Sequence, residues 1–179
     1  QQQALVQMRP EVFSDLAVEV ALIRPGPLQG NMVHPFFRRR QGLEPVQYLH
    51  PTLEPILAET LGVVVFQEQV IRVAMAMGGF SAGEADLLRR AMGKKKQEVM
   101  EKEKVNFRDG AVKKGFSAAD ADRIFEILIP FAGYGFNKSH AAVYSVLAYQ
   151  TAWLKANFPA EFIAANLTNE ISSVDKLPE

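Results

Sequence analysis

The helical spacing of apolar residues between start and stop signals most constrains the fold, and it is clearest in SAGEADLLRRAMGKKK at residues 81–96. Ser81 and Glu84 have the spacing of a capping box, in which each side chain satisfies a backbone N–H at a helix start. Three apolar residues then recur at i, i+3 and i+7: Ala85, Leu88 and Met92. Because this spacing places them on one face and Gly93 is a typical helix end, the stretch is predicted to be a helix with one buried face.

Five cations lie at the end of this predicted helix. They are Arg89, Arg90, Lys94, Lys95 and Lys96, with no acidic residue between them. A helix C-terminus favours cations, and so much positive charge suits an anion such as a phosphate. Charge runs are more often solvated surfaces, however, so charge alone favours a solvated helix end.

Similar apolar spacing predicts helices along most of the chain. They cover residues 11–23, 67–77, 97–115, 117–129 and 141–157, and a last helix starts at Pro159. Pro130 is expected to end the helix before it. Residues 33–55 are rich in proline and are expected to form an irregular, largely exposed connection. The predicted fold class is mainly α, a multi-helix domain with at most a short β element at GVVVF, residues 62–66, which fits either a strand or a helix start.

Composition excludes several kinds of site. The chain has 179 residues, 48% of them hydrophobic, which is enough for one core or two small lobes. Cysteine is absent, which excludes disulfides, thiolate zinc sites and thiol nucleophiles. A formal net charge of zero argues against a broadly basic nucleic-acid coat. With no signal-peptide pattern and no apolar run of membrane-spanning length, we expect a cytoplasmic protein without membrane contact.

The stretch AGYGFNKSH, residues 132–140, leads directly into a long helical pattern. Its two glycines permit a close approach of the backbone to a ligand, and Ser139 is expected to cap the following helix, whose free N–H groups suit an anion. His140 and Tyr144 are four residues apart and share a helical face. Such glycine-rich loops are weak signals by themselves, and from the residues alone Tyr144 is better explained as a core aromatic.

Further polar residues have two interpretations each. Arg24 lies at a stiff RPGP turn, where it could be held over a phosphate or simply end a helix. Arg38, Arg39 and Arg40 point in different directions on any regular backbone, so at most two could follow one nucleic-acid strand, and the residues alone favour a solvated face. The glutamines and glutamate at residues 67–69 are expected to reach outward and to support a partner contact.

No metal site is predicted. Catalytic metal ions in phosphoryl transfer need paired carboxylates. Asp120 and Asp122 are two residues apart, but at a helix start they diverge by about 200°. We interpret them as helix-start charge.

Four segments in register resemble the fingers domain of the bacterial replicative DNA polymerase III alpha subunit, a C-family polymerase. They are ALIRPGPLQG at 21–30, GVVVFQEQV at 62–70, EADLLRRAMGKKK at 84–96 and FAGYGFNKSHAAVYSVLAYQTAWLKANFPAEF at 131–162. The resemblance covers residues 8–170. VEVALIRPGP and TLGVVVFQEQ are closer to the error-prone repair paralogue, whereas AMGKKK and YGFNKSHA are closer to the replicative form. Both paralogues therefore stay open.

The resemblance implies a fingers domain at residues 11–170 with sub-lobes at 11–80 and 81–170. Residues 1–10, a boundary segment, and 171–179 would be linkers in a longer protein. The parent enzyme would bind DNA template-primer and deoxynucleoside triphosphates, for replication or repair synthesis, beside further polymerase domains and replisome subunits. Its Mg²⁺ would be held by aspartates of another domain. No catalytic residue is therefore expected in this chain, and the isolated fragment is expected to be inactive.

The resemblance also implies roles for particular residues. Arg89 and Arg90 would contact the incoming triphosphate, and Lys94, Lys95 and Lys96 would help there or at the template backbone. A second group would border the nascent base pair: Asn137, Lys138, Ser139, His140 and Tyr144. Candidate phosphate or DNA contacts are Arg24, Arg38 and Arg39.

Two other classes of function are open from the residues alone. A stand-alone helical nucleic-acid-binding module would need a broad basic surface, which the neutral charge and the clustered cations disfavour. A protein-interaction domain could dock a partner on AAVYSVLAYQTAW, residues 141–153, although core packing explains that helix more economically.

Overall fold

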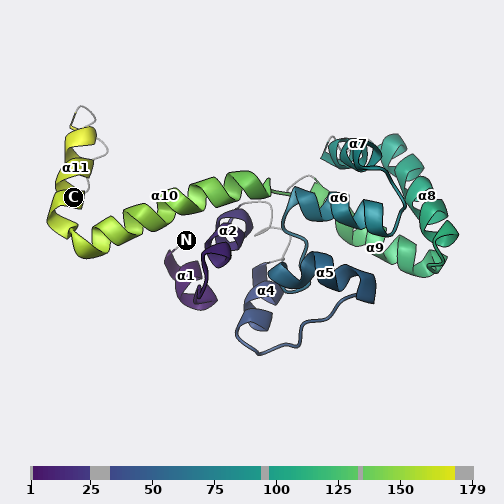
Figure 1. The fold of residues 1–179 in the computed structure, drawn as a ribbon, viewed down its shortest axis with the longest axis horizontal. Coiled ribbons are helices and arrows are strands. Elements are labelled where there is room, and N and C mark those ends of the chain that lie inside the picture. The colour runs from purple at the N-terminus through teal and green to yellow at the C-terminus, as the bar shows by residue number, and fades with distance from the viewer. Residues whose placement is uncertain (1, 25–32, 94–96, 133–134, 172–179) are drawn as a thin grey trace. The chain divides into compact units, whose positions relative to one another are not determined.

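The computed structural model describes residues 2–24, 33–93, 97–132 and 135–171. It divides into two compact units, Gln1–Ala142 and Val143–Glu179. The first unit contains α1 (Gln2–Met8), α2 (Phe13–Leu22), α4 (Val33–Arg40), α5 (Glu54–Leu57), α6 (Gln67–Ala76), α7 (Ala82–Gly93), α8 (Gln97–Lys113), α9 (Ala118–Ala132) and the short 3₁₀ turns η1 (Pro51–Leu53) and η2 (Ala58–Thr60). The helix α10 (Lys138–Asn157) crosses the boundary between the units, and α11 (Pro159–Asn169) follows it (Figure 1).

The mainly α prediction is confirmed. Within the described ranges, the β pairing consists of one isolated parallel bridge between Phe66 and Phe136. Residues 63–66 therefore form an extended segment with a single bridge and not a strand. Gly62 lies in the turn before it, and α6 begins directly after it.

The expectation of an irregular connection at residues 33–55 is wrong in its first part, where α4 forms, and at η1 and α5. Phe36 and Phe37 on α4 are buried, so tertiary packing stabilises a helix that local sequence signals do not mark. Pro35 lies in the first turn of α4, where a helix needs no N–H donor.

Two predicted helix ends are also wrong. The helix α9 continues past Pro130 to Ala132, since a proline in the last turn removes only its own N–H and a single hydrogen bond. The helix α10 starts at Lys138, three residues earlier than expected, because its cap is Asn137 and not Ser139. The Oδ1 atom of Asn137 accepts a hydrogen bond from the backbone N–H of His140 at 2.8 Å.

The first unit contains two hydrophobic cores. One is formed by η1 and helices α5 to α9, with the buried rings of Phe107 and Phe125 packed at 5.5 Å between centroids. The other is formed by α1, α2 and α4 with part of the extended segment. That segment contributes Val64 to the first core and Val63 and Val65 to the second. Successive side chains of an extended backbone point to opposite sides, so the segment lies between the two cores.

Residues 1–10 were expected to act as a linker, and they include α1. Met8 on α1 is 1% exposed and belongs to the second core. The predicted domain limits at 11–170 and the two sub-lobes stay predictions.

The side chain of Gln69 holds the extended segment in place. Its Oε1 accepts hydrogen bonds from the N–H groups of Val65 at 2.8 Å and Phe66 at 2.9 Å. Its Nε2 donates to Thr60 Oγ1 at 2.8 Å and to the Ile56 carbonyl at 3.3 Å. Gln69 is 1% exposed, so the expectation that it reaches outward is wrong. A buried extended segment needs its N–H groups satisfied, and this amide does so.

The second unit consists of most of α10 and of α11. Pro159 occupies the first turn of α11, as predicted, and the Trp153 ring packs on Phe158 at 5.7 Å between centroids. Many large apolar side chains of these helices are exposed: Val143, Tyr144, Val146, Leu147, Tyr149, Trp153, Leu154, Phe158, Ile163 and Leu167. Core packing within this chain therefore does not account for the helix at 141–153. None of the described helices is both long and apolar enough to span a bilayer.

The turn that follows α6 crosses α8 closely at two glycines, Gly78 in that turn and Gly110 in α8. A Cβ atom added to Gly110 would collide with the carbonyl oxygen of Gly78, and one added to Gly78 would lie 2.6 Å from the Phe107 ring. Lys114 follows α8, and its Nζ donates to the carbonyls of Met75 at 3.2 Å and Ala76 at 2.6 Å. The crossing therefore requires glycine at both positions.

We predict that Gly110→Ala destabilises the chain by about 1 to 3 kcal/mol or more, the usual cost of overpacking, because the backbone of Gly78 must move. Gly83→Ala on α7 is the matched control, since no described atom lies within 4 Å of its added Cβ. The control should be neutral or stabilise by up to about 1 kcal/mol through helix propensity. Urea unfolding of both variants measures the difference, and equal midpoints would contradict the close crossing.

Candidate functional site

The helix α7 begins with the predicted capping box. The Glu84 carboxylate accepts hydrogen bonds from Ser81 N at 2.8 Å and Ser81 Oγ at 2.7 Å, and Glu84 N donates to Ser81 Oγ at 3.3 Å. These hydrogen bonds from Ser81 lower the pKa of the Glu84 carboxyl. The capping box therefore determines where α7 begins, and with it the places of Arg89 and Arg90 along the helix.

Arg89 and Arg90 share one carboxylate partner on α7. Arg89 Nε donates to Asp86 Oδ1 at 2.9 Å, and Arg90 Nε lies 2.8 Å from Asp86 Oδ2. The hydrogen bond from Arg89 is the main reason why the pKa of Asp86 is lowered, and the charges of both guanidinium groups act in the same direction. Asp86 therefore stays ionised at neutral pH and reduces the repulsion between the two adjacent cations.

Gln67 joins Arg89 to the loop before α10. Its side-chain Oε1 accepts a hydrogen bond from Arg89 NH1 at 3.2 Å, and its Nε2 donates to the Gly135 carbonyl at 2.7 Å. Its backbone N–H donates to the Phe136 carbonyl at 3.0 Å, and Phe136 N donates in turn to Val65 at 3.2 Å. Two sequence motifs that lie far apart in the chain therefore meet at one glutamine.

Glu68 binds the first turn of α10. Its carboxylate accepts hydrogen bonds from Asn137 Nδ2 at 3.1 Å and from the backbone N–H of Lys138 at 3.0 Å. The anion at this helix N-terminus is thus a side chain of the protein itself. The ammonium group of Lys138 pairs with Glu59 at 2.6 Å.

Arg24 and His140 both contact the ring of Phe136. The Arg24 guanidinium carbon lies 4.3 Å from the ring centroid, a cation–π geometry. The His140 ring packs edge-on at 5.2 Å between centroids. Ser139 is exposed beside them. Tyr144 follows on α10 in the second unit and is 51% exposed, which contradicts the interpretation as a core aromatic.

The three adjacent arginines of α4 point to three different partners, as expected. Arg38 Nε pairs with Glu44 at 2.6 Å, Arg39 NH1 donates to the Leu61 carbonyl at 2.7 Å, and Arg40 NH2 pairs with Asp15 at 2.8 Å. Each guanidinium thus ties α4 to another segment. The DNA contacts expected for Arg38 and Arg39 stay predictions.

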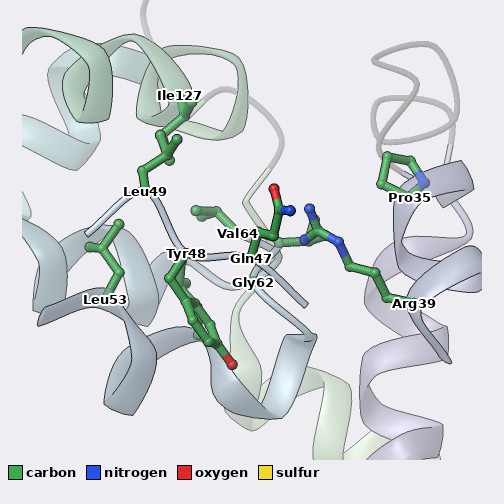
Figure 2. Close-up of a pocket in the computed structure, with 11 residues that line it drawn as sticks. Pro35, Arg39, Gln47, Tyr48, Leu49, Leu53, Gly62, Val64 and Ile127 are labelled. Carbon is green, nitrogen blue, oxygen red and sulfur yellow. The ribbon is translucent and has the colours of Figure 1, made fainter. Parts of the chain in front are cut away.

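Arg39 also lines a pocket of about 380 Å³ with mostly apolar walls. Figure 2 shows its side chain reaching from α4 toward Gln47 and Gly62. Gly62 has a φ of +80°, and a Cβ there would lie 2.9 Å from Arg39 NH1, so only glycine fits. The eleven lining residues include neither Arg89 nor any residue of 135–140, so the pocket is separate from the predicted nucleotide site.

Some predicted site residues lie outside the described ranges: Lys94, Lys95 and Lys96, together with the RPGP turn after Arg24 and the first glycine of the loop. The interpretation as helix-start charge is confirmed for Asp120, which lies in the first turn of α9, whereas Asp122 lies further along the helix. Asp120 N donates to Ser117 Oγ at 3.0 Å, and Asp122 pairs with Arg108 at 3.4 Å. In the described part of the chain, no group of three or more His, Asp or Glu residues is arranged to hold a metal ion.

Comparison with known proteins decides the family. Residues 1–115 match the model of the bacterial DNA polymerase III alpha subunit finger domain. The chain belongs to this family. This match covers the first three of the four resembling segments, and the relatives below cover the fourth, so the resemblance is confirmed.

Full-length relatives extend the match beyond residue 115. The chain is 56% identical over 174 residues to the DNA polymerase III subunit alpha of Treponema pallidum. This match covers 97% of the chain and 15% of that protein. It is 54% identical over 176 residues to the subunit of Borreliella burgdorferi, and this match covers 98% of the chain and 15% of that protein. It is 47% identical over 176 residues to the subunit of Escherichia coli K12, and this match covers 96% of the chain and 15% of that protein. This fingers domain therefore spans about 15% of the length of these relatives.

Sequence reasoning missed the residues that organise this site. It gave residues 67–69 only a supporting role, and it did not identify Glu68 or Asn137 as partners of α10. The available signal for Asn137 was its residue type directly before a helical pattern, because asparagine is among the best N-caps.

Proposed function

We propose that Arg89 and Arg90 of this fingers domain bind the triphosphate of an incoming deoxynucleotide, in a polymerase that extends a primer on a DNA template. The observation that carries the proposal is the link through Gln67 between Arg89 and the backbone of the loop at Gly135. This link brings the two motifs with the expected substrate contacts into one site. An unrelated solvated helix end would have no need of it.

The free donors of Arg89 support this role. Its contacts with described residues use two N–H groups, one toward Asp86 and one toward Gln67, out of the five that a guanidinium has. Its side chain is 22% exposed, so part of it is accessible to solvent. Cations fixed before the reaction stabilise the charge that develops on a leaving pyrophosphate, and a guanidinium can bind phosphate oxygens in pairs.

The rest of the assignment extends this proposal. Lys94, Lys95 and Lys96 assist at the triphosphate or at the template backbone, and Arg24, Arg38 and Arg39 contact phosphates of the DNA. The nascent base pair is bordered by Asn137, Lys138, Ser139, His140 and Tyr144. Mg²⁺ is held by carboxylates of another domain, and this domain, residues 11–170, acts with the remaining domains and the replisome subunits.

We predict that Arg89→Ala and Arg90→Ala in the full-length polymerase each cost about 2 to 4 kcal/mol of transition-state stabilisation, the range for losing one preorganised donor. Lysine at either position should restore only part of the rate because it lacks the paired donors. Single-nucleotide incorporation measures kcat/KM for each variant. Arg123→Ala, which removes an exposed cation of α9, is the control and should keep the normal rate.

The outcome separates the two interpretations of this helix end. Normal incorporation by both Arg89→Ala and Arg90→Ala would mean that these cations are only solvated or structural. A loss that also appears in the Arg123 control would indicate a general effect of net charge.

Tyr144 gives an independent prediction about the base-pair group. Because it is half-exposed, Tyr144→Ala should leave the melting temperature nearly unchanged, whereas stacking on a base is worth about 1 to 3 kcal/mol. We expect Tyr144→Phe to retain nucleotide affinity and Tyr144→Ala to lower it. Early melting with normal nucleotide binding would show a packing role instead.

The isolated chain is predicted not to polymerise. Metal-assisted transfer needs carboxylates that hold the ions, and we place these in another domain. Primer extension is measured with the purified chain, Mg²⁺ and all four deoxynucleotides, beside the full-length enzyme. Extension by the purified chain that a chelator abolishes would overturn this prediction.

A further inference from the structure

We infer that Gln67 is a positioning residue, which holds the Arg89 guanidinium at a fixed place relative to the backbone of residues 135–138. The inference rests on the proposed function of Arg89 and adds the residue through which the loop and the arginine are coupled. Gln67 itself is not expected to touch the nucleotide.

Only an amide side chain fits both of its contacts. Toward Arg89 the site needs an acceptor, and toward the Gly135 carbonyl it needs a donor. The opposite orientation of the amide would place its N–H groups against a guanidinium and its oxygen against a carbonyl. Its orientation is therefore determined by its two partners.

The backbone of Gln67 is held as firmly as its side chain. Its N–H donates to the Phe136 carbonyl at 3.0 Å, and the preceding residue, Phe66, is bound by the buried amide of Gln69 at 2.9 Å. The backbone of Gln67 therefore has a fixed position, and both its N–H group and its side chain bind the same loop, at Phe136 and Gly135. Gln67 cannot follow Arg89 if the arginine side chain moves.

Arg89 in turn is held at two different atoms. Asp86 binds its Nε and Gln67 binds its NH1, so the plane of the guanidinium is defined by contacts to α7 and to α6. Without Gln67, the group could rotate about its remaining contact with Asp86. A shift of the loop that carries Asn137 and Lys138 would be transmitted through Gln67 to Arg89. Binding of the base pair beside the loop and binding of the triphosphate by Arg89 would thus depend on each other.

Two substitutions test this role in the full-length polymerase. Gln67→Met keeps the approximate size and loses both contacts, and Gln67→Glu keeps the acceptor for Arg89 but places a carboxylate against the Gly135 carbonyl. We expect Gln67→Met to lower kcat/KM for single-nucleotide incorporation by about 10- to 100-fold, as small misplacements of reacting groups do. Gln67→Glu should lie between Gln67→Met and the wild type. Glutamate is favourable in the first turn of a helix, so this second variant is expected to fold.

Gln41→Met is the matched control. The Nε2 atom of Gln41 also donates to a backbone carbonyl, that of Gln7 at 3.3 Å, but Gln41 has no contact with Arg89 among the described residues. Its kinetics should equal those of the wild type.

A double-mutant cycle shows whether Gln67 acts through Arg89. In the Arg89→Ala background, Gln67→Met should cause no further loss, because the group that it positions is gone. If Arg89→Ala alone has no effect, the proposed function of Arg89 fails. If Arg89→Ala lowers the rate but Gln67→Met leaves it unchanged, or if the two losses multiply, the proposed function stands and the positioning role is overturned.

Discussion

The buried amide of Gln69 is the interaction on which the rest of the first unit depends. It satisfies the N–H groups of Val65 and Phe66, which lie between two cores; in the described part of the chain this segment has a single bridge, to Phe136, and no strand beside it. Leaving one such buried group unsatisfied costs about 1 to 3 kcal/mol, so the extended segment requires this side chain. Because Phe66 pairs with Phe136, the same amide also determines where the chain meets the loop that precedes α10. The side chain of Gln69 thus contributes both to the packing of the two cores and to the geometry of the site.

The first turn of α6 distributes three polar residues in three directions. Successive residues of a helix are rotated by about 100°, so neighbours in sequence face different surroundings. Gln69 points into the core, Glu68 binds the first turn of α10, and Gln67 bridges Arg89 and Gly135. Each contact would be lost if the turn were shifted by one residue. The glycines, the prolines and the apolar spacing of the sequence indicate where this turn lies in the chain. The hydrogen bonds of its polar residues determine which other segments it contacts.

The sequence allowed prediction of elements whose signals are local. The capping box of Ser81 and Glu84, the apolar stripe of α6 and the start of α11 at Pro159 all follow from residues within one or two turns, and the structure agrees. It did not allow prediction of α4, which is stabilised by the burial of Phe36 and Phe37 in a core formed by distant segments. The same reason applies to the site. A contact between residues 67 and 135 leaves no periodic pattern, so Gln67 was recognised as polar but not as a bridge.

Arg89 and Arg90 differ in a way that bears on how a triphosphate would be held. Arg89 contacts both Asp86 and Gln67 and its side chain is 22% exposed. The side chain of Arg90 is 64% exposed, and its partner among the described residues is the Asp86 carboxylate. Ordering a long, exposed side chain costs conformational entropy at the moment of binding, and Arg89 has already lost most of that freedom. Under the proposed function, Arg89 therefore supplies a preorganised contact and Arg90 an adaptable one. The ionised Asp86 between them reduces the repulsion of the two adjacent cations before a ligand is present, and a bound triphosphate would share the arginines with this carboxylate.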